Sequence, residues 1–444
     1  MNPLLSQCRE AWMALEPFRA RRRRCKRAAY STNGSSPNNL VRQLLKSVVG
    51  RYRFLRTGSR VDLDADVRAE LDLDAASLEE FLISGMTVNR KRLPFSGITQ
   101  GAHSFVNVSP QRLFFTRFCQ PDGADASFFG MLHDFSPSRL LQLFAHRDAP
   151  TARLLLSHFS SLSSTVSALS SSSTHQLTLS STPCSESAID FDSPDMPGNI
   201  RVIEVWQELT LHSLHIHDLL HAEYIILPYC DESADAVAQL HRQRLDSSLP
   251  GVVAALSTAK AWKHSWLLPD GFVIESETVA PEAFPFVMRL YPMTDGETHS
   301  LVEDVLPQQE HINRLVEMLD RVIRQSAKGV LLFPTEQLPD GFSWQDMRRI
   351  WADPGGIIPY RSTVRGIQPQ QINSVGWHQG AAEMLKTQLD LFAEVSGMAP
   401  SFRGREAKFA GSEAARIDSQ NASIALLDLM AAFHAFVAQR KSKV

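Results

Sequence analysis

Residues 298–326 have the sequence THSLVEDVLPQQEHINRLVEMLDRVIRQS, and this stretch carries the clearest helical pattern of the chain. Its apolar residues recur three, four or seven positions apart, so they share one face of a helix. Ser300 and Glu303 have the spacing of a capping box at the start of that helix. Pro307 lies inside the pattern and predicts a kink or a broken first turn. The apolar positions are Leu301, Val305, Ile312, Val316, Leu319 and Ile323.

Helical patterns also precede this stretch. Residues 38–54 are amphipathic, and an acidic helix is expected over about 61–85, with Ser77 and Glu80 as a capping pattern inside it. A short helix is expected after Ser136, because Pro137 then occupies a favoured first helical position.

Three further helices are expected downstream. Residues 343–352 and 380–395 have helical patterns, and Gly397 is a C-cap candidate for the second of them. Gly329 is expected to end the 298–326 helix, and a final helix is expected over about 412–440.

Extended segments lie between the helices. Residues 103–118 and 266–290 favour strands, the second with a turn at 269–271. Residues 200–206 alternate as a strand does, with 224–228 as a candidate hairpin partner, and 330–333 predicts a short buried strand. These patterns together predict an α+β fold that is mainly helical.

The composition is that of a globular protein. The chain has 444 residues, of which 43% are hydrophobic and 21% charged, and this excludes disordered, collagen-like and disulfide-scaffold classes. Length allows two to four domains at roughly 100–200 residues each. No apolar run approaches the roughly 18–20 residues of a membrane helix, so no spanning segment is expected. Residues 157–187 include fourteen Ser, which predicts a flexible insertion.

Charge is distributed unevenly along the chain. Residues 1–60 carry a net charge of +12, whereas the remainder carries −15. A basic head on an acidic body is compatible with nucleic-acid contact, an acidic partner, a targeting signal or simply a solvated basic helix. A cleaved organellar presequence within residues 4–30 is a further alternative, although Glu10 and Glu16 interrupt the acid-poor pattern of such segments.

The five cysteines are scattered and contain no CxxC pair. This spacing predicts neither a disulfide framework nor a cysteine zinc site. The N-terminus also lacks the apolar core of a secretory signal, so an intracellular, reducing compartment is expected.

A histidine-rich stretch is the densest group of ligand-type residues. On a helix, His217 and His221 would share a face, and on a strand His215 and His217 would do so. This cluster is the basis of one alternative function, a metal-dependent hydrolase. The glutamate of the HExxH motif and a distant third ligand are both absent, which favours exposed strand or turn histidines. The cluster consists of His212, His215, His217, Asp218 and His221.

No sequence motif nominates a catalytic residue. The chain contains no GxxxxGK[ST], GxGxxG or GxSxG segment. The carboxylate pairs Glu303/Asp304 and Glu79/Glu80 lie where helix caps are expected. The sequence therefore predicts a protein that is not an enzyme, with no metal site and no cofactor.

Several ordered segments together resemble the portal proteins of tailed bacteriophages, and the likeness is greatest to those of crAss-like phages. The block at 285–334 is the most specific part. Weaker similarities lie at 38–42, 79–85 and 202–206. The segments within and after the specific block are 285–292, 295–300, 302–305, 308–309, 312–315, 326–334, 391–392, 395–397, 420–422 and 426–429.

The resemblance implies a portal fold with wing, stem and clip parts and a short or absent crown. It implies a stem helix at 298–326 whose channel-side candidates are Glu303, Asp304, Gln308, Asn313 and Arg314. A first stem helix is expected upstream, near 136–160. The implied parts are an N-terminal wing part at 1–150, a possible stem segment with the Ser-rich insertion at 151–199, a clip-containing β region at 200–297, a second wing part at 327–410 and a helix toward the crown at 411–444.

The resemblance also implies a function. Portal subunits form a twelve-copy ring at one capsid vertex, assembled in the host cytoplasm and kept in the virion. The ring is the channel for packaging and ejection of double-stranded DNA without sequence specificity. The implied partners are the terminase large subunit, a head–tail adaptor, and capsid and scaffold proteins, with no membrane. Candidate DNA contacts are Arg403, Arg405 and Lys408.

Three features depart from the family pattern: the Ser-rich stretch, Pro307 and the short C-terminal segment. The charge distribution is compatible with the implied function, because an acidic channel that neutralises few phosphates lets DNA slide. The basic N-terminus is then a candidate contact with capsid or scaffold.

Overall fold

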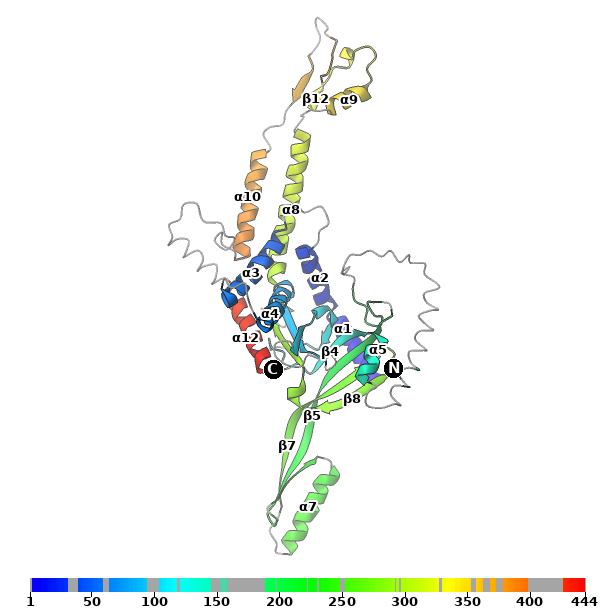
Figure 1. The fold of residues 1–444 in the computed structure, drawn as a ribbon, viewed down its shortest axis with the longest axis vertical. Coiled ribbons are helices and arrows are strands. Elements are labelled where there is room, and N and C mark those ends of the chain that lie inside the picture. The colour runs from blue at the N-terminus through cyan, green and yellow to red at the C-terminus, as the bar shows by residue number, and fades with distance from the viewer. Residues whose placement is uncertain are drawn as a thin grey trace, which may run out of the picture. The chain divides into compact units, whose positions relative to one another are not determined.

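The chain divides into two compact units, which are described separately (Figure 1). Unit 1 comprises Met1–Ser31, Arg42–Asp304 and Ser419–Val444, and unit 2 comprises Thr32–Val41 and Val305–Asp418. The computed structural model describes residues 2–30, 39–58, 64–93, 104–117, 120–144, 153, 155, 157, 188–196, 198–221, 223–229, 231–247, 252–291, 293–294, 297–326, 330–352, 357–361, 368–372, 378–397 and 426–443.

Unit 1 begins with two helices, whose bounds the charge pattern did not predict. They are α1 (Pro3–Ala14) and α2 (Glu16–Tyr30). In α2, Arg24 and Arg27 are exposed whereas Arg19 and Arg22 are buried, so the interpretation as a solvated basic helix holds for only part of its basic residues. Arg22 instead makes a two-point contact with Glu80, with N–O distances of 2.5 and 2.6 Å. Carboxylates inside the fold thus neutralise part of the positive charge of residues 1–60.

Both predicted helices of the next segment are present, as α3 (Leu40–Thr57) and α4 (Ala65–Ser84). The second ends at Gly85, whose φ of 71° is a left-handed conformation that glycine adopts without strain. The Ser77/Glu80 capping prediction is wrong, because Ser77 lies in the middle of α4. Its hydroxyl donates a hydrogen bond to the Leu73 carbonyl one turn earlier.

Two antiparallel sheets form the centre of unit 1. One has the order β2–β1–β9, and the other has the order β3–β4–β5–β7–β8, with β6 pairing to β5. Strands lie within both predicted extended segments, at 105–107 and 113–115 in the first and at 266–267, 273–279 and 286–290 in the second. The strands at 128–135 and 252–265 were not predicted. The strands are β1 (Met86–Lys91), β2 (Phe105–Asn107), β3 (Leu113–Phe115), β4 (Phe128–Phe135), β5 (Ile200–Asp218), β6 (Glu223–Pro228), β7 (Val252–Leu267), β8 (Val273–Val279) and β9 (Phe286–Leu290).

The predicted hairpin partner of residues 200–206 is wrong. β6 pairs with the far end of β5, Ser213–Asp218. The start of β5 pairs instead with β4 on one side and β7 on the other. The error arises because β5 is 19 residues long and its alternation continues well beyond Trp206.

Two local predictions in unit 1 are confirmed, and one helix was missed. Helix α5 (Pro137–Phe144) follows Ser136, whose Oγ accepts a hydrogen bond from the Arg139 amide at 3.4 Å. The turn at 269–271 joins β7 to β8, and Gly271 has a φ of 93°. Sequence reasoning did not predict α7 (Asp231–Asp246).

The core of unit 1 lies on both sides of the larger sheet. Helix α1 packs its buried residues, including Leu5 and Trp12, against Phe114 and Phe128. A second cluster joins Met86 and Phe286 of the smaller sheet to Phe129. Helix α12 (Leu427–Ser442) returns to pack near β9.

Helix α8 (Leu301–Ser326) confirms the predicted 298–326 helix and extends from the end of unit 1 into unit 2. Ser300 Oγ accepts a hydrogen bond from the Glu303 amide at 3.0 Å, which confirms the cap. The helix is continuous through Pro307, so the predicted broken first turn is wrong. Gly329 lies outside the described residues.

Unit 2 otherwise contains α9 (Trp344–Ala352), α10 (His378–Val395) and the strand pair β12 (Val330–Leu332) and β13 (Gln370–Ile372). The two helices are as predicted, and Gly397 has a φ of 65°, as expected after α10. The predicted strand at 330–333 is present, but Leu332 is 50% exposed, so this strand is not buried along its length.

Two predicted segments lie largely outside the described residues. Of residues 157–187, only Ser157 is described, and residues 412–425 of the predicted final helix lie outside the described part. Helix α12 confirms the rest of that helix. The short elements are β10 (Met293–Thr294), β11 (Glu297–Thr298) and the 3₁₀ turns Pro110–Arg112, Pro281–Ala283 and Thr335–Gln337. Of the helices described, none is long and apolar enough to cross a bilayer.

Candidate functional site

One part of unit 1, which we call the arm, leaves much apolar surface exposed. The arm consists of Leu209–Asp218 of β5, all of β6, helix α7 and Val252–Ala261 of β7, drawn in green in Figure 1. Its three strands have the order β6–β5–β7. The arm therefore presents a small sheet with one helix beside it.

Helix α7 covers one face of the arm sheet. Val237 of the helix packs on a small cluster of Leu214, Ile216 and Val252. Arg244 binds the carboxylate of Asp218 through two nitrogens, one of them at 2.9 Å. The hydrogen bonds from Arg244 and His221 hold the pKa of Asp218 well below its usual range.

The opposite face of the arm sheet has no helix of the described arm over it. Tyr224 of β6 is 60% exposed, and Ile226 of β6 and Val253 of β7 are each 56% exposed. A contiguous apolar surface on a folded chain marks an interaction site. Over both faces of its sheet and on α7, the arm has the exposed apolar residues Leu211, Tyr224, Ile225, Ile226, Leu227, Leu240, Leu245, Val253 and Leu256, and Leu219, Leu220 and Tyr229 lie next to it in the chain.

The arm sheet also has two unpaired edges. Among the described strands, β6 pairs only with β5. The pairing of β7 with β8 begins at Trp262, so Val252–Ala261 is paired only on its β5 side within the described chain. Unpaired strand edges are templates for pairing with another chain. The two edges lie on opposite sides of the same sheet.

The histidine cluster is split by this strand geometry. His215 and His217 lie on the uncovered face, where the imidazole of His215 contacts the hydroxyls of Tyr224 and Ser213. His221 lies in the following turn, with Nδ1 2.9 Å from Asp218 Oδ2. Within the described residues, no three ligand-type side chains are grouped as a metal site. The metal-dependent hydrolase alternative therefore has no support.

The channel-side candidates all lie on α8. Glu303, Gln308 and Asn313 are half-buried, whereas Asp304 and Arg314 are exposed. Asn313 Oδ1 accepts a hydrogen bond from Gln309 Nε2 at 2.8 Å. Partial withdrawal from water, aided by the neighbouring Glu303, raises the pKa of Asp304. The candidate DNA contacts Arg403, Arg405 and Lys408 lie outside the described residues.

Sequence reasoning missed a buried charged centre at Glu204 on β5. Arg90 Nη2 lies 2.6 Å from one carboxylate oxygen, and His133 Nε2 lies 2.7 Å from the other. His264 and the indole N–H of Trp206 complete the shell. Burial alone would raise the pKa of Glu204, but these charged and hydrogen-bonding neighbours outweigh it and hold the pKa well below its usual range. The only sequence signal was an acid among the apolar residues of 202–206.

A second buried network joins the C-terminal helix to the N-terminal helices of unit 1. Arg440 lies 2.6 Å from Asp74 Oδ1 and donates to Asn89 Oδ1 at 3.1 Å. Tyr52 donates to the other Asp74 oxygen at 2.7 Å. Arg440 and Asp74 are more than 360 residues apart, so no local pattern could have indicated the pair.

The model of one protein family, the phage P22-like portal proteins, matches residues 104–442. The match spans more than half of the chain and includes the larger sheet with the arm, strands β2 and β9 of the smaller sheet, and α8. This chain belongs to the P22-like phage portal protein family. No curated protein matches this portal protein.

Family membership confirms the portal resemblance at the level of the family and the α+β fold class. It implies a homo-oligomeric ring that works with other proteins of the phage head at a capsid vertex. The arm, with its two open edges and exposed apolar face, is the described part of this portal protein best suited to contact other copies.

Proposed function

We propose that this portal protein forms a closed ring at a capsid vertex, and that neighbouring copies are joined through the arm. The ring is the channel for double-stranded DNA during packaging and ejection and a docking platform for the terminase and the head–tail adaptor. The observation that carries the proposal is the pair of open strand edges on opposite sides of one sheet.

A ring needs an interface in which one surface of a copy meets a different surface of the next. The β6 edge and the Val252–Ala261 edge of β7 are two such surfaces, because each copy offers both. When β6 of one copy pairs with β7 of its neighbour, the two end copies of the growing oligomer each keep one free edge. The contact therefore repeats until these two edges meet and the ring closes.

The direction of the pairing follows from the register of the arm. Both β6 and β7 run antiparallel to β5, so they run parallel to each other. If the ring axis runs along the arm strands, the rotation that relates neighbouring copies leaves the direction of each strand unchanged. The strands joined between copies are therefore expected to be parallel.

The side chains at the two edges are suited to burial. Ile225, Ile226 and Leu227 of β6 are all more than a third exposed in the isolated chain. Burial of apolar surface contributes about 25 cal/mol per Å², which favours association of these edges. The uncovered face with Tyr224 and Val253 adds further apolar surface near the same contact.

The finer assignments are part of the same proposal. The clip lies in 200–297, which contains the arm, and the stem helix in 298–326 presents Glu303, Asp304, Gln308, Asn313 and Arg314 toward the channel. The wing lies in 1–150 and 327–410, the possible first stem segment in 151–199, and the crown-directed helix in 411–444. The ring has twelve copies, acts without enzymatic activity or cofactor, and resembles most the portals of crAss-like phages.

Inter-copy disulfides test the arm contact directly. Ile226→Cys on β6 is combined in one chain with Val253→Cys, Ala255→Cys or Ser257→Cys on β7, which scans the register. Cys119, Cys184 and Cys230 are replaced by Ser. At least one pair is expected to give a ladder of crosslinked oligomers on a non-reducing gel, because the two positions belong to different copies.

The control combines Ile226→Cys with Ser276→Cys on β8, which lies away from the arm edges. This pair and the single variants are expected to give no ladder. Native-size oligomers that show no crosslink at any of the three registers would contradict the arm contact.

The candidate DNA contacts have their own test. Charge reversal of Arg403 and Arg405 to Glu is expected to lower packaged DNA per particle, measured by nuclease protection, while leaving ring assembly intact. Unchanged packaging in the double variant would remove this assignment.

A further inference from the structure

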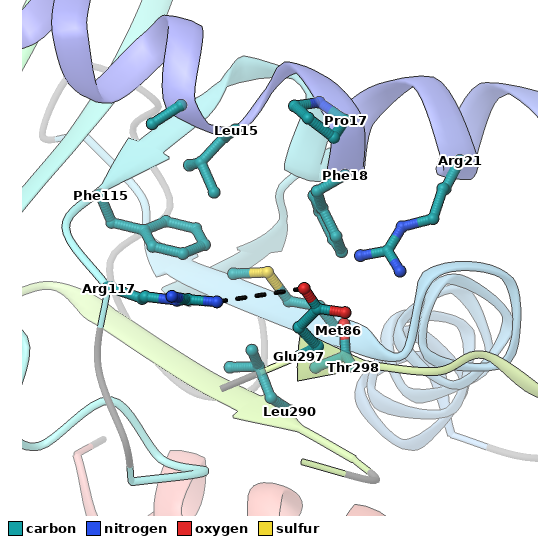
Figure 2. A pocket seen from close by; sticks show the side chains of 11 residues that line it. Leu15, Pro17, Phe18, Arg21, Met86, Phe115, Arg117, Leu290, Glu297 and Thr298 are labelled. Carbon is teal, nitrogen blue, oxygen red and sulfur yellow. Dashed lines mark ion pairs between the residues drawn. The ribbon is translucent and has the colours of Figure 1, made fainter. Parts of the chain in front are cut away.

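A cavity of about 380 Å³ lies in unit 1 where the α1–α2 junction crosses the smaller sheet (Figure 2). Binding pockets for small ligands or anchoring side chains have volumes of about 300–1,000 Å³. The apolar lining comes from Leu15, Phe18, Met86, Phe115 and Leu290.

The cavity exists because the two N-terminal helices do not form one continuous rod. Helix α1 ends at Ala14, and Pro17 lies at the start of α2. Leu15, at the junction of the two helices, and Phe18, in the first turn of α2, therefore approach the sheet at different points and leave space between them. Met86 and Leu290 form the opposite side of that space, as Figure 2 shows.

Arg21 differs from the neighbouring arginines of α2. Arg19 and Arg23 both pair with Glu16, and Arg22 pairs with Glu80. Arg21 has no hydrogen bond or ion pair with any described residue. It lines the cavity instead, and Figure 2 shows its guanidinium directed toward that space.

A second guanidinium lies at the mouth of the cavity. Arg117 approaches Glu297 only to 4.0 Å, and the two side chains are 78% and 56% exposed. An ion pair this long and this exposed contributes little, so Arg117 is free to turn to another carboxylate. The mouth thus has two guanidinium groups and one carboxylate around an apolar interior.

We propose that this cavity, which we call the Arg21 pocket, binds an acidic, apolar peptide segment of another protein. An aromatic or long aliphatic side chain of that segment enters the apolar interior. Carboxylates next to it bind Arg21 and Arg117, because guanidinium groups bind carboxylates in two-point contacts. The positive charge of residues 1–60 favours the approach of an acidic partner.

The probe is a fluorescein-labelled peptide of sequence Asp-Glu-Trp-Leu-Asp-Glu, measured by fluorescence anisotropy with the full-length protein. Two companion peptides replace Trp-Leu by Ala-Ala or replace the four acids by Lys. We expect saturable binding of the first peptide and at least tenfold weaker binding of both companions.

Protein variants separate the pocket from general charge attraction. Arg21→Glu is expected to weaken binding of the acidic peptide at least tenfold. Leu15→Ser, at the partly exposed rim, is expected to weaken it severalfold through the lost apolar contact. The matched control is Arg27→Glu, which makes the same charge change on an exposed residue of α2 outside the pocket and is expected to change the affinity less than twofold.

Equal loss with Arg27→Glu and Arg21→Glu would overturn the proposal in favour of unspecific attraction. Equal binding of the Lys companion would overturn it too. Binding to the monomer that is lost in the assembled ring would show that a second copy, rather than another protein, occupies the pocket. Binding retained by the ring supports the proposal even if the arm does not join the copies.

Discussion

Glu204 is enclosed in β5 at the centre of unit 1, with Arg90 and two histidines around its carboxylate. A buried carboxylate is costly unless charged partners and hydrogen bonds compensate it. Arg90, His133 and His264 come from three other strands, and Trp206 lies two positions away on β5. The strands must therefore be assembled before this shell forms. The centre therefore contributes to cooperativity of unit 1.

Replacing Glu204 by Gln is expected to lower the free energy of unfolding at pH 7 by about 3–5 kcal/mol, because Arg90 would be left without its partner. The folded pKa of Glu204 is depressed, so its contribution is present above the unfolded pKa of about 4.3 and is lost as the pH falls through the folded pKa. Urea unfolding between pH 7 and pH 3 is the measurement. The variant should lose stability less steeply than the wild type below pH 4.3, and parallel curves would contradict this account.

Arg440 offers a second prediction at the level of one residue. Arg440→Met removes the guanidinium that lies 2.6 Å from buried Asp74 and leaves only that of Arg56 at 3.7 Å. This change is expected to cost about 3 kcal/mol in the free energy of unfolding. The matched control is the next residue, because Lys441 is half-exposed and pairs with Glu70 at 2.7 Å. Lys441→Met is expected to cost at most about 1 kcal/mol. Similar losses for both variants, in denaturant titrations, would contradict a special role of the buried pair.

At the scale of single elements, periodicity predicted the helices well. The α8 pattern and its capping residue Ser300 were visible because helix starts and apolar stripes are local features. The prediction of Ser77 as a cap failed because a serine inside a helix can donate its hydroxyl to a backbone carbonyl one turn earlier, as Ser77 does to Leu73. Its neighbour in space, Asn89, is twelve residues away and donates to it at 2.9 Å, which no local rule anticipates.

The strands were harder to predict because pairing is not local. Both β5 and β6 were indicated by the sequence, but β6 was predicted to pair with the start of β5, whereas it pairs with the end. The length of β5 decides the partner, and alternation alone does not show where a long strand changes neighbours. Helix α7 was not predicted. It packs on the arm sheet, and the sequence did not predict that sheet.

Pro307 gives a prediction for α8. It lies in the helix interior, where it cannot donate a hydrogen bond to the Glu303 carbonyl. Pro307→Ala is expected to raise the free energy of unfolding by up to about 3 kcal/mol, measured by thermal and denaturant unfolding. Glu317→Ala, on an exposed position of the same helix, is expected to change it by less than about 0.5 kcal/mol. An unchanged or lower stability for Pro307→Ala would show that the helix depends on the proline.

At the scale of the whole molecule, the described residues form no grouped metal site. What the described chain offers instead is surface: two open strand edges, an apolar face and a pocket with an unpaired arginine. The portal family was predictable because its motifs are collinear with the sequence. The arm edges and the Arg21 pocket were not, because each combines segments far apart in the chain.

The portal account makes one demand of the protein as a whole, that copies close around a hollow axis. Cryo-electron microscopy of the purified full-length protein measures this directly. The account predicts closed rings with a central opening wide enough for a DNA duplex, with β6 of each copy beside β7 of the next. Compact monomers, or oligomers without an axial opening, at concentrations where the arm contact should form, would contradict it.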